Sequence, residues 1–164
     1  MVLDIRFLFF QKYYSTFNTV YETVFLTLYK TLILPMLQIN QIHHVAIICS
    51  DYQKSKYFYT EILGFKIIEE VYRAERKSYK LDLSVNGNYQ IELFSFPNPP
   101  ARTSHPEACG LRHLAFEVNN IKETRDYLIL QSIDCEEIRI DEFTNKTFFF
   151  INDPDELPIE FYEK

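Results

Sequence analysis

The segments His44–Asp51 (HVAIICSD) and His113–Asn120 (HLAFEVNN) align without gaps at an offset of 69 residues. Each begins with a histidine, continues as an apolar run and ends in a small polar residue suited to cap a helix. A helical pattern follows each segment, over 51–63 and over 121–131. The second helical pattern starts with a capping-box-like pair, Asn120 and Glu123. This matched pair of segments predicts an internal repeat in which a strand precedes a helix.

Three strand-like segments follow each helical pattern. They span 65–72, 78–85 and 89–96 in the first half, and 135–140, 146–151 and 158–162 in the second half. Asn86-Gly87 predicts a two-residue hairpin, because both residues accept a positive φ. The last segment of each half has a glutamate after an isoleucine, Glu92 and Glu160, at an offset of 68. The sequence therefore predicts an α+β fold of two tandem βαβββ modules.

The predicted domain covers residues 39–164 of the 164-residue chain. Module one spans 40–97 and module two spans 110–164. Between them lies a linker over 97–110, which contains four of the seven prolines of the chain and is therefore expected to be stiff.

Residues 1–38 differ in composition from the rest of the chain. They hold nine of the 27 aromatic residues and none of the three glycines. The apolar run from Val24 to Leu37 is about half of a membrane span and is interrupted by Lys30. An alternative to a membrane or signal segment is that translation starts at Met36, which places the upstream residues outside the true reading frame. If these residues belong to the protein, we expect a loosely packed helix or an interaction arm.

Composition narrows the classes of function. The formal net charge is −6 and there is no basic block, so nucleic acid is not expected as a partner. The three cysteines are far apart and form no CxxC motif, which disfavours a disulfide scaffold or a thiolate zinc site and fits a reducing, cytoplasmic location. The hydrophobic fraction of 47% is ample for a packed core.

The repeated histidine and glutamate carry the chemistry that the sequence predicts. In each module a histidine heads one strand, and a carboxylate lies within another apolar strand. Because an unpaired buried carboxylate is costly, it needs a metal, a cation or water as partner. His44, Glu92, His113 and Glu160 make a two-nitrogen, two-oxygen ligand set for one divalent ion such as Zn²⁺, Ni²⁺, Co²⁺, Mn²⁺ or Fe²⁺. A neighbouring histidine, His43, is expected to be structural.

These residues carry a resemblance to a known family. Residues 40–164 resemble the vicinal oxygen chelate superfamily, and within it the small bacterial glyoxalase I-like (lactoylglutathione lyase-related) proteins. This superfamily includes bleomycin resistance proteins and dioxygenases. The matching stretches are 42–47 (IHHVAI), 58–65 (FYTEILGF), 91–94 (IELF), 110–116 (GLRHLAF) and 152–155 (NDPD) before Ile159-Glu160.

The resemblance implies that the two modules form a curled mixed sheet around a metal site. The implied ligands are His44, Glu92, His113 and Glu160, with Zn²⁺ or Ni²⁺ favoured. The resemblance also implies that Glu160 is the catalytic residue that moves a proton while the metal stabilises an enediolate. The implied substrate is a small molecule, a thiol hemithioacetal of a 2-oxoaldehyde or a related oxygenated metabolite. Members of the family commonly form homodimers, some of which share each metal between chains, and no membrane partner is implied.

The sequence departs from the glyoxalase I pattern at positions that concern the substrate. Ile48 stands where an arginine that helps to bind glutathione is expected, and Phe96 stands where an asparagine is expected. Glu156 replaces a glycine after Asn-Asp-Pro-Asp, which predicts a strained turn. These departures weaken the case for glutathione. Arg73, Arg76 and Arg102 are candidate replacements for binding an anion, with surface charge as the alternative.

Three functions therefore stay open at this point. The first is a metal-dependent lyase or isomerase of the glyoxalase I type. The second is a thiol transferase or dioxygenase on the same site, although four protein ligands leave few open positions for a dioxygenase. The third is a non-catalytic module that binds a drug or metabolite.

Overall fold

The computed structural model describes residues 19–24 and 37–164, in a chain that divides into two compact units, Met1–Gln41 and Ile42–Lys164. Residues 19–24 are helical and exposed. The other expectations for residues 1–36 fall outside the described residues. Within the described part of the chain, no helix has the length and apolar character needed to cross a membrane.

The first module contains one helical segment and four strands. In chain order these are β1 (Val45–Cys49), α2 (Tyr52–Tyr57), the π-helical turn η1 (Phe58–Ile62), β2 (Lys66–Arg73), the short helical turn η2 (Ala74–Arg76), β3 (Ser78–Val85) and β4 (Asn88–Ser95). Asp51 caps α2 by accepting a hydrogen bond from the Lys54 backbone amide. The predicted hairpin is confirmed, with φ values of 49° at Asn86 and 84° at Gly87.

The second module repeats this order with shorter elements. They are β5 (Leu114–Val118), α3 (Ile121–Leu130), β6 (Arg139–Ile140), β7 (Thr147–Asn152) and β8 (Pro158–Glu163). Asn120 caps α3 through the Glu123 backbone amide, as its sequence predicts. The strand expected over 135–140 is reduced to two residues, Arg139 and Ile140, so β6 is a short edge strand.

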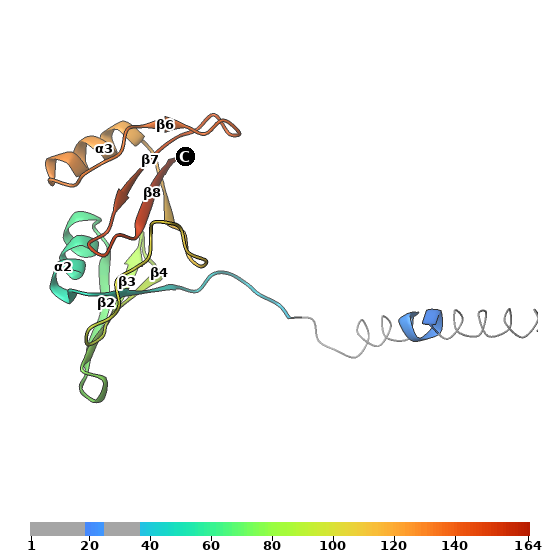
Figure 1. Ribbon diagram of the computed structural model, residues 1–164. Coiled ribbons are helices and arrows are strands. Elements are labelled where there is room, and N and C mark those ends of the chain that lie inside the picture. Colours follow the sequence, from blue (N-terminus) through green and yellow to red (C-terminus); the bar gives the residue numbers. More distant parts are fainter. Residues whose placement is uncertain (1–18, 25–36) are drawn as a thin grey trace, which may run out of the picture. The chain divides into compact units, whose positions relative to one another are not determined.

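The two modules share one topology. The first sheet has the order β1-β4-β3-β2 and the second has β5-β8-β7-β6 (Figure 1). In each sheet the first and last strands of the module pair in parallel, and the remaining neighbours are antiparallel. The βαβββ repeat is therefore confirmed. The sheets remain two separate four-stranded sheets, so a single curled sheet closed around a metal is not formed within the chain.

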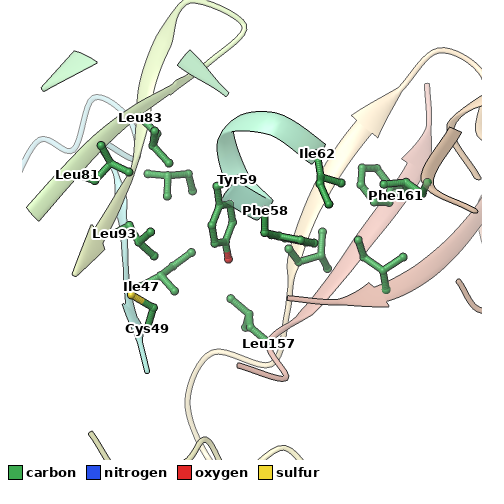
Figure 2. Close-up of a cluster of buried hydrophobic side chains, with 14 of the residues drawn as sticks. Ile47, Cys49, Phe58, Tyr59, Ile62, Leu81, Leu83, Leu93, Leu157 and Phe161 are labelled. Atoms are coloured by element: carbon green, nitrogen blue, oxygen red, sulfur yellow. The ribbon is translucent and has the colours of Figure 1, made fainter. Parts of the chain in front are cut away.

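The core lies between the two sheets and includes residues from both modules. Figure 2 shows Phe58, Tyr59 and Ile62 of the helical turn between strand residues of the first sheet and Phe161 of the second. Tyr59 is fully buried, and burying an aromatic ring of this size is among the larger single contributions to a core. The helical segment of module one therefore joins the two modules into one hydrophobic cluster.

The turn between β7 and β8 is fixed by hydrogen bonds to the first module. The Tyr59 hydroxyl donates to Asp153 Oδ2 at 2.8 Å, and the Ser50 amide donates to the Asp155 carboxylate at 3.1 Å. Burial raises the pKa of Asp153, although two backbone amides and the Tyr59 hydroxyl oppose that shift. Glu156 has a φ of 64°, the left-handed conformation expected at this position. These contacts set where β8 begins, shortly before Glu160.

Candidate metal centre

The first pair of predicted ligands is formed by His44 and Glu92. His44 directly precedes β1, and Ala46 pairs with Glu92 in the parallel register of β1 and β4. This register places His44 Nε2 3.1 Å from Glu92 Oε2. The other ring nitrogen, Nδ1, lies 2.8 Å from Nδ1 of His43. If His44 donates in this bond, its Nε2 is unprotonated and free to bind a metal, which gives His43 a role in orienting the ligand.

The second pair has the same geometry. His113 directly precedes β5, and Ala115 pairs with Glu160 in the parallel register of β5 and β8. His113 Nε2 lies 3.2 Å from Glu160 Oε2. His113 Nδ1 is buried and has no hydrogen-bond partner among the described residues. An unpaired ring nitrogen of this kind is uncommon in a buried position.

Both pairs fit the donor chemistry of a divalent ion. Nitrogen and oxygen ligands lie about 2.0–2.2 Å from such an ion, so two adjacent ligands are separated by roughly 3 Å. The separations within the two pairs, 3.1 and 3.2 Å, match that spacing. Imidazole with carboxylate is also a donor set that several first-row metals accept.

Within the described residues, the chain does not bring the four predicted ligands together. Side chains alternate along a strand, so Glu92 and Glu160 lie on the faces opposite to Ile91 and Ile159, which are in the core. The two pairs thus lie on outward faces of two sheets whose inner faces pack together. No group of three or more His, Cys, Asp or Glu side chains suited to a metal occurs within residues 19–24 and 37–164.

The two carboxylates have different surroundings. Glu92 Oε1 accepts hydrogen bonds from the Tyr89 hydroxyl at 2.6 Å and from Lys80 Nζ at 2.9 Å. Lys80 also contacts both oxygens of Asp82 at 2.6 Å. Burial by itself raises the pKa of Glu92, but the bonds from Tyr89 and Lys80 outweigh it and lower that pKa overall. Glu92 is therefore held as an anion, with only Oε2 turned toward His44.

Glu160 lacks this network. In the second sheet the positions that correspond to Asp82 and Lys80 are occupied by Phe150 and Phe148. The Phe150 ring lies 5.3 Å from the His113 ring, edge to face. Within the described part of the chain, His113 is the only side chain in polar contact with Glu160, so Oε1 has no donor. The alternation Lys80-Leu81-Asp82 in β3 is the sequence signal for this difference, and it was not recognised from the sequence.

The arginines proposed from sequence lie in different settings. The Arg73 guanidinium lies over the rings of Phe94 and Phe96. Phe96, which replaces the asparagine of the glyoxalase I pattern, therefore supports an arginine in this chain. Arg102 donates to the backbone carbonyls of Leu111 and Arg112 in the linker region. Arg76 is exposed. The side chain of Ile48 is 56% exposed on the same face as Glu92.

A cavity of about 230 Å³ adjoins His113. Its walls include Arg112, Arg139 and Phe150 from the second module and His105 from the linker. The cavity is large enough for a small metabolite beside the second pair of ligands. The three cysteines are all free, and burial raises the pKa of Cys49 to about 11, which leaves its thiol protonated and disfavours it as a nucleophile.

Comparison with known proteins identifies the family. Residues 41–161 match the glyoxalase/bleomycin resistance protein/dioxygenase superfamily. The chain is 58% identical to the Bacillus subtilis (strain 168) protein YwkD over 126 residues, which cover 77% of this chain and 98% of that protein.

Two solved structures share the fold. The crystal structure of a glyoxalase family protein from Enterococcus faecalis is 48% identical, with a TM-score of 0.71, and the match covers 76% of this chain and 98% of that one. A mutant of the fosfomycin resistance protein FosX from Listeria monocytogenes was crystallised with Mn(II) and 1S,2S-dihydroxypropylphosphonic acid. It is 16% identical, with a TM-score of 0.59 over 76% of this chain and 93% of that one, a likeness of fold. The chain belongs to the glyoxalase/bleomycin resistance protein/dioxygenase superfamily, which confirms the resemblance carried by its paired histidines and glutamates.

Proposed function

We propose that the protein is a metal-dependent isomerase of the glyoxalase I type. Its substrate would be a thiol hemithioacetal of a 2-oxoaldehyde, or a related small molecule with two vicinal oxygens. The observation that carries the proposal is the repeated pair, with His44 Nε2 and Glu92 Oε2 3.1 Å apart and His113 Nε2 and Glu160 Oε2 3.2 Å apart. Both separations suit ligands of one divalent ion.

In the proposed site, His44, Glu92, His113 and Glu160 would hold one divalent ion, Zn²⁺ or Ni²⁺ by preference. The bound ion supplies Lewis acidity toward two neighbouring substrate oxygens. Because the two pairs lie on outward faces of separate sheets, we infer that each centre takes His44 and Glu92 from one chain and His113 and Glu160 from a second chain.

A homodimer of this kind is supported by the exposure of the first sheet. On the face that carries Glu92, Ile48 and Val71 are 56% and 41% exposed, and β2 is exposed along most of its length. Apolar strand residues that remain exposed commonly mark an interface. In a two-fold symmetric dimer, the first pair of each chain would meet the second pair of the other chain. The dimer would therefore hold two complete centres.

Glu160 is the residue that would move the proton. Its Oε1 has no donor in the described residues, whereas Glu92 Oε1 is occupied by Tyr89 and Lys80. A carboxylate oxygen that accepts no hydrogen bond from the protein is free to take a proton from a substrate. Glu160 would take the proton from the carbon that bears sulfur and return it to the adjacent carbonyl carbon, which yields the 2-hydroxy thioester without net oxidation or reduction.

The free cysteines fit the reducing, cytoplasmic location that we propose for this activity.

The proposed function is tested by removing metal from the full-length protein and reloading it with Zn²⁺, Ni²⁺, Co²⁺ or Mn²⁺. We expect at least one metal form to isomerise the hemithioacetal of methylglyoxal, measured by the ultraviolet absorbance of the thioester. Assays with adducts of glutathione and of a small neutral thiol show whether turnover depends on the thiol that forms the adduct. Stoichiometric metal without turnover on either adduct would contradict the proposed reaction.

The contacts of Glu92 lead to a second expected result. Replacing Lys80 with Met is expected to weaken metal binding by about 10–100-fold, because outer contacts of this kind orient metal ligands. Lys80→Arg should recover part of the affinity. Tyr89→Phe removes the other donor to Glu92, together with its longer contact of 3.5 Å to Asp82. Affinity is measured by competition with a chromophoric chelator, with Lys122→Met at an exposed helical ion pair as the control. Unchanged affinity in both Lys80→Met and Tyr89→Phe would show that these donors do not support the ligand.

A further inference from the structure

Arg73 lies on the face of the first sheet that carries Glu92. It ends β2 and pairs with Ser78 of β3, and Ser78 shares its face with Lys80 and Asp82 because side chains alternate along the strand. Both Nε and an Nη of Arg73 donate to Ser78 Oγ, at 3.2 and 2.8 Å. Its guanidinium therefore points across the sheet on the side of the proposed metal ligands.

Two aromatic rings support this guanidinium. Its central carbon lies 4.7 Å from the centre of the Phe94 ring and 5.6 Å from the centre of the Phe96 ring. The two rings are stacked, with an interplanar angle of 21°. Contacts with ring faces restrain the guanidinium plane and leave the N–H groups at its edge available to a ligand.

Arg73 has no carboxylate partner among the described residues, in contrast to Arg139. Among the described residues it is half-buried and forms no ion pair, whereas Arg139 pairs with Glu136 at 2.7 Å. The comparison is close, because Arg139 also lies over two phenylalanine rings, those of Phe148 and Phe150. Of two guanidiniums on aromatic platforms, Arg139 is neutralised within the chain and Arg73 is not.

We propose that Arg73, on the platform of Phe94 and Phe96, binds a carboxylate at the end of the substrate remote from the metal-bound oxygens. This inference rests on the proposed function, because it assigns the substrate class of the same site. A guanidinium and a carboxylate form two parallel hydrogen bonds, the strongest charge-assisted arrangement available to side chains. Ser78 Oγ accepts from Nε and one Nη of Arg73, and the remaining N–H groups of the guanidinium are left for such a pair.

The register limits the length of the substrate. Phe94 is two residues beyond Glu92 in β4, and Phe96 directly follows the end of β4, four residues beyond Glu92. These spacings correspond to roughly 7 and 13 Å at about 3.3 Å per residue. The guanidinium lies over both rings, so the carboxylate would be several bonds from the chelating oxygens. A short metabolite such as a simple 2-oxoaldehyde does not span this distance, whereas an adduct with a carboxylate-bearing thiol does.

The test uses two chelating probes of equal chain length, suberate monohydroxamate and octanohydroxamate, which end in a carboxylate and a methyl group. We expect the Mn²⁺-loaded protein to bind the carboxylate probe about tenfold or more tightly than the methyl probe. Arg73→Gln should remove this preference and leave the affinity for octanohydroxamate unchanged. Arg73→Lys should keep part of the preference, and Arg139→Gln should keep all of it. Equal affinity of the wild-type protein for both probes, or a preference that survives Arg73→Gln, would overturn the inference.

A second measurement separates this inference from the proposed metal chemistry. In metal-free protein, the Nε–Hε resonance of Arg73, assigned by its loss in Arg73→Lys, should shift saturably as acetate is added. If neither hydroxamate binds in a metal-dependent way but acetate shifts this resonance, the proposed function fails and the carboxylate site stands. If both hydroxamates bind equally and acetate causes no shift, the carboxylate site fails and the metal site stands.

Discussion

Replacing Glu160 with Gln is expected to reduce turnover by about 10²–10⁴-fold, the usual contribution of a positioned general base. The amide keeps an oxygen that can approach a metal but has lost the basic site. Metal affinity should fall far less than turnover, by roughly tenfold, because three of the four proposed ligands are unchanged. The measurement is kcat for hemithioacetal isomerisation beside the metal content of the purified variant.

The effect follows from the unequal surroundings of the two carboxylates. Glu92 Oε1 is occupied by the Tyr89 hydroxyl and Lys80 Nζ, and these bonds lower the pKa of Glu92 despite its burial. Among the described residues, His113 is the only side chain in polar contact with Glu160, and Phe150 lies beside that histidine. Glu92→Gln should therefore act mainly on metal affinity, whereas Glu160→Gln should act mainly on kcat.

The control is Glu75→Gln, an exposed acid in the short helical turn η2 of the first module. It should leave metal content and turnover unchanged. Loss of metal in Glu160→Gln that matches its loss of turnover would assign Glu160 as a ligand only. Full turnover in Glu160→Gln with full metal content would remove the residue from the reaction altogether.

The fold could be predicted from the sequence because local and long-range signals agree. The two histidine-headed strands, the capped helices and the Asn86-Gly87 turn each indicate their own structure, and the repeat fixes how they connect. The exception is the strand over 135–140, of which only Arg139 and Ile140 pair with β7. Its apolar pattern is weak, and an edge strand receives hydrogen bonds from one side only.

The site could be predicted only as two pairs. Alternation along a strand places His44 near Glu92 and His113 near Glu160, because each histidine heads a strand that is parallel to the strand of its glutamate. How the pairs meet depends on which sheet faces pack together, and periodicity does not encode that. The support of Glu92 by Lys80 and Tyr89 joins three strand positions through side-chain rotamers, so spacing alone does not predict it.

The proposed assembly of each centre from two chains has an expected result that no single-chain site produces. One variant loses the first pair through His44→Ala and Glu92→Ala, and another loses the second pair through His113→Ala and Glu160→Ala. Each variant alone should bind no metal at the centre and show no turnover. A mixed dimer of the two joins the intact second pair of one chain to the intact first pair of the other, while its other centre lacks all four side chains.

Denaturing the two variants together and refolding them at equal concentration should therefore restore metal to about one quarter of the centres, because about half of the dimers are mixed and each mixed dimer has one complete centre of two. Turnover should return in the same proportion to wild-type protein carried through the same refolding, which serves as the control. If each centre were built within one chain, both variants would lack a complete ligand set and mixing would restore nothing. Recovery near one quarter is thus diagnostic of exchange between chains, since it requires that His44 and Glu92 act with the histidine and glutamate of a different copy.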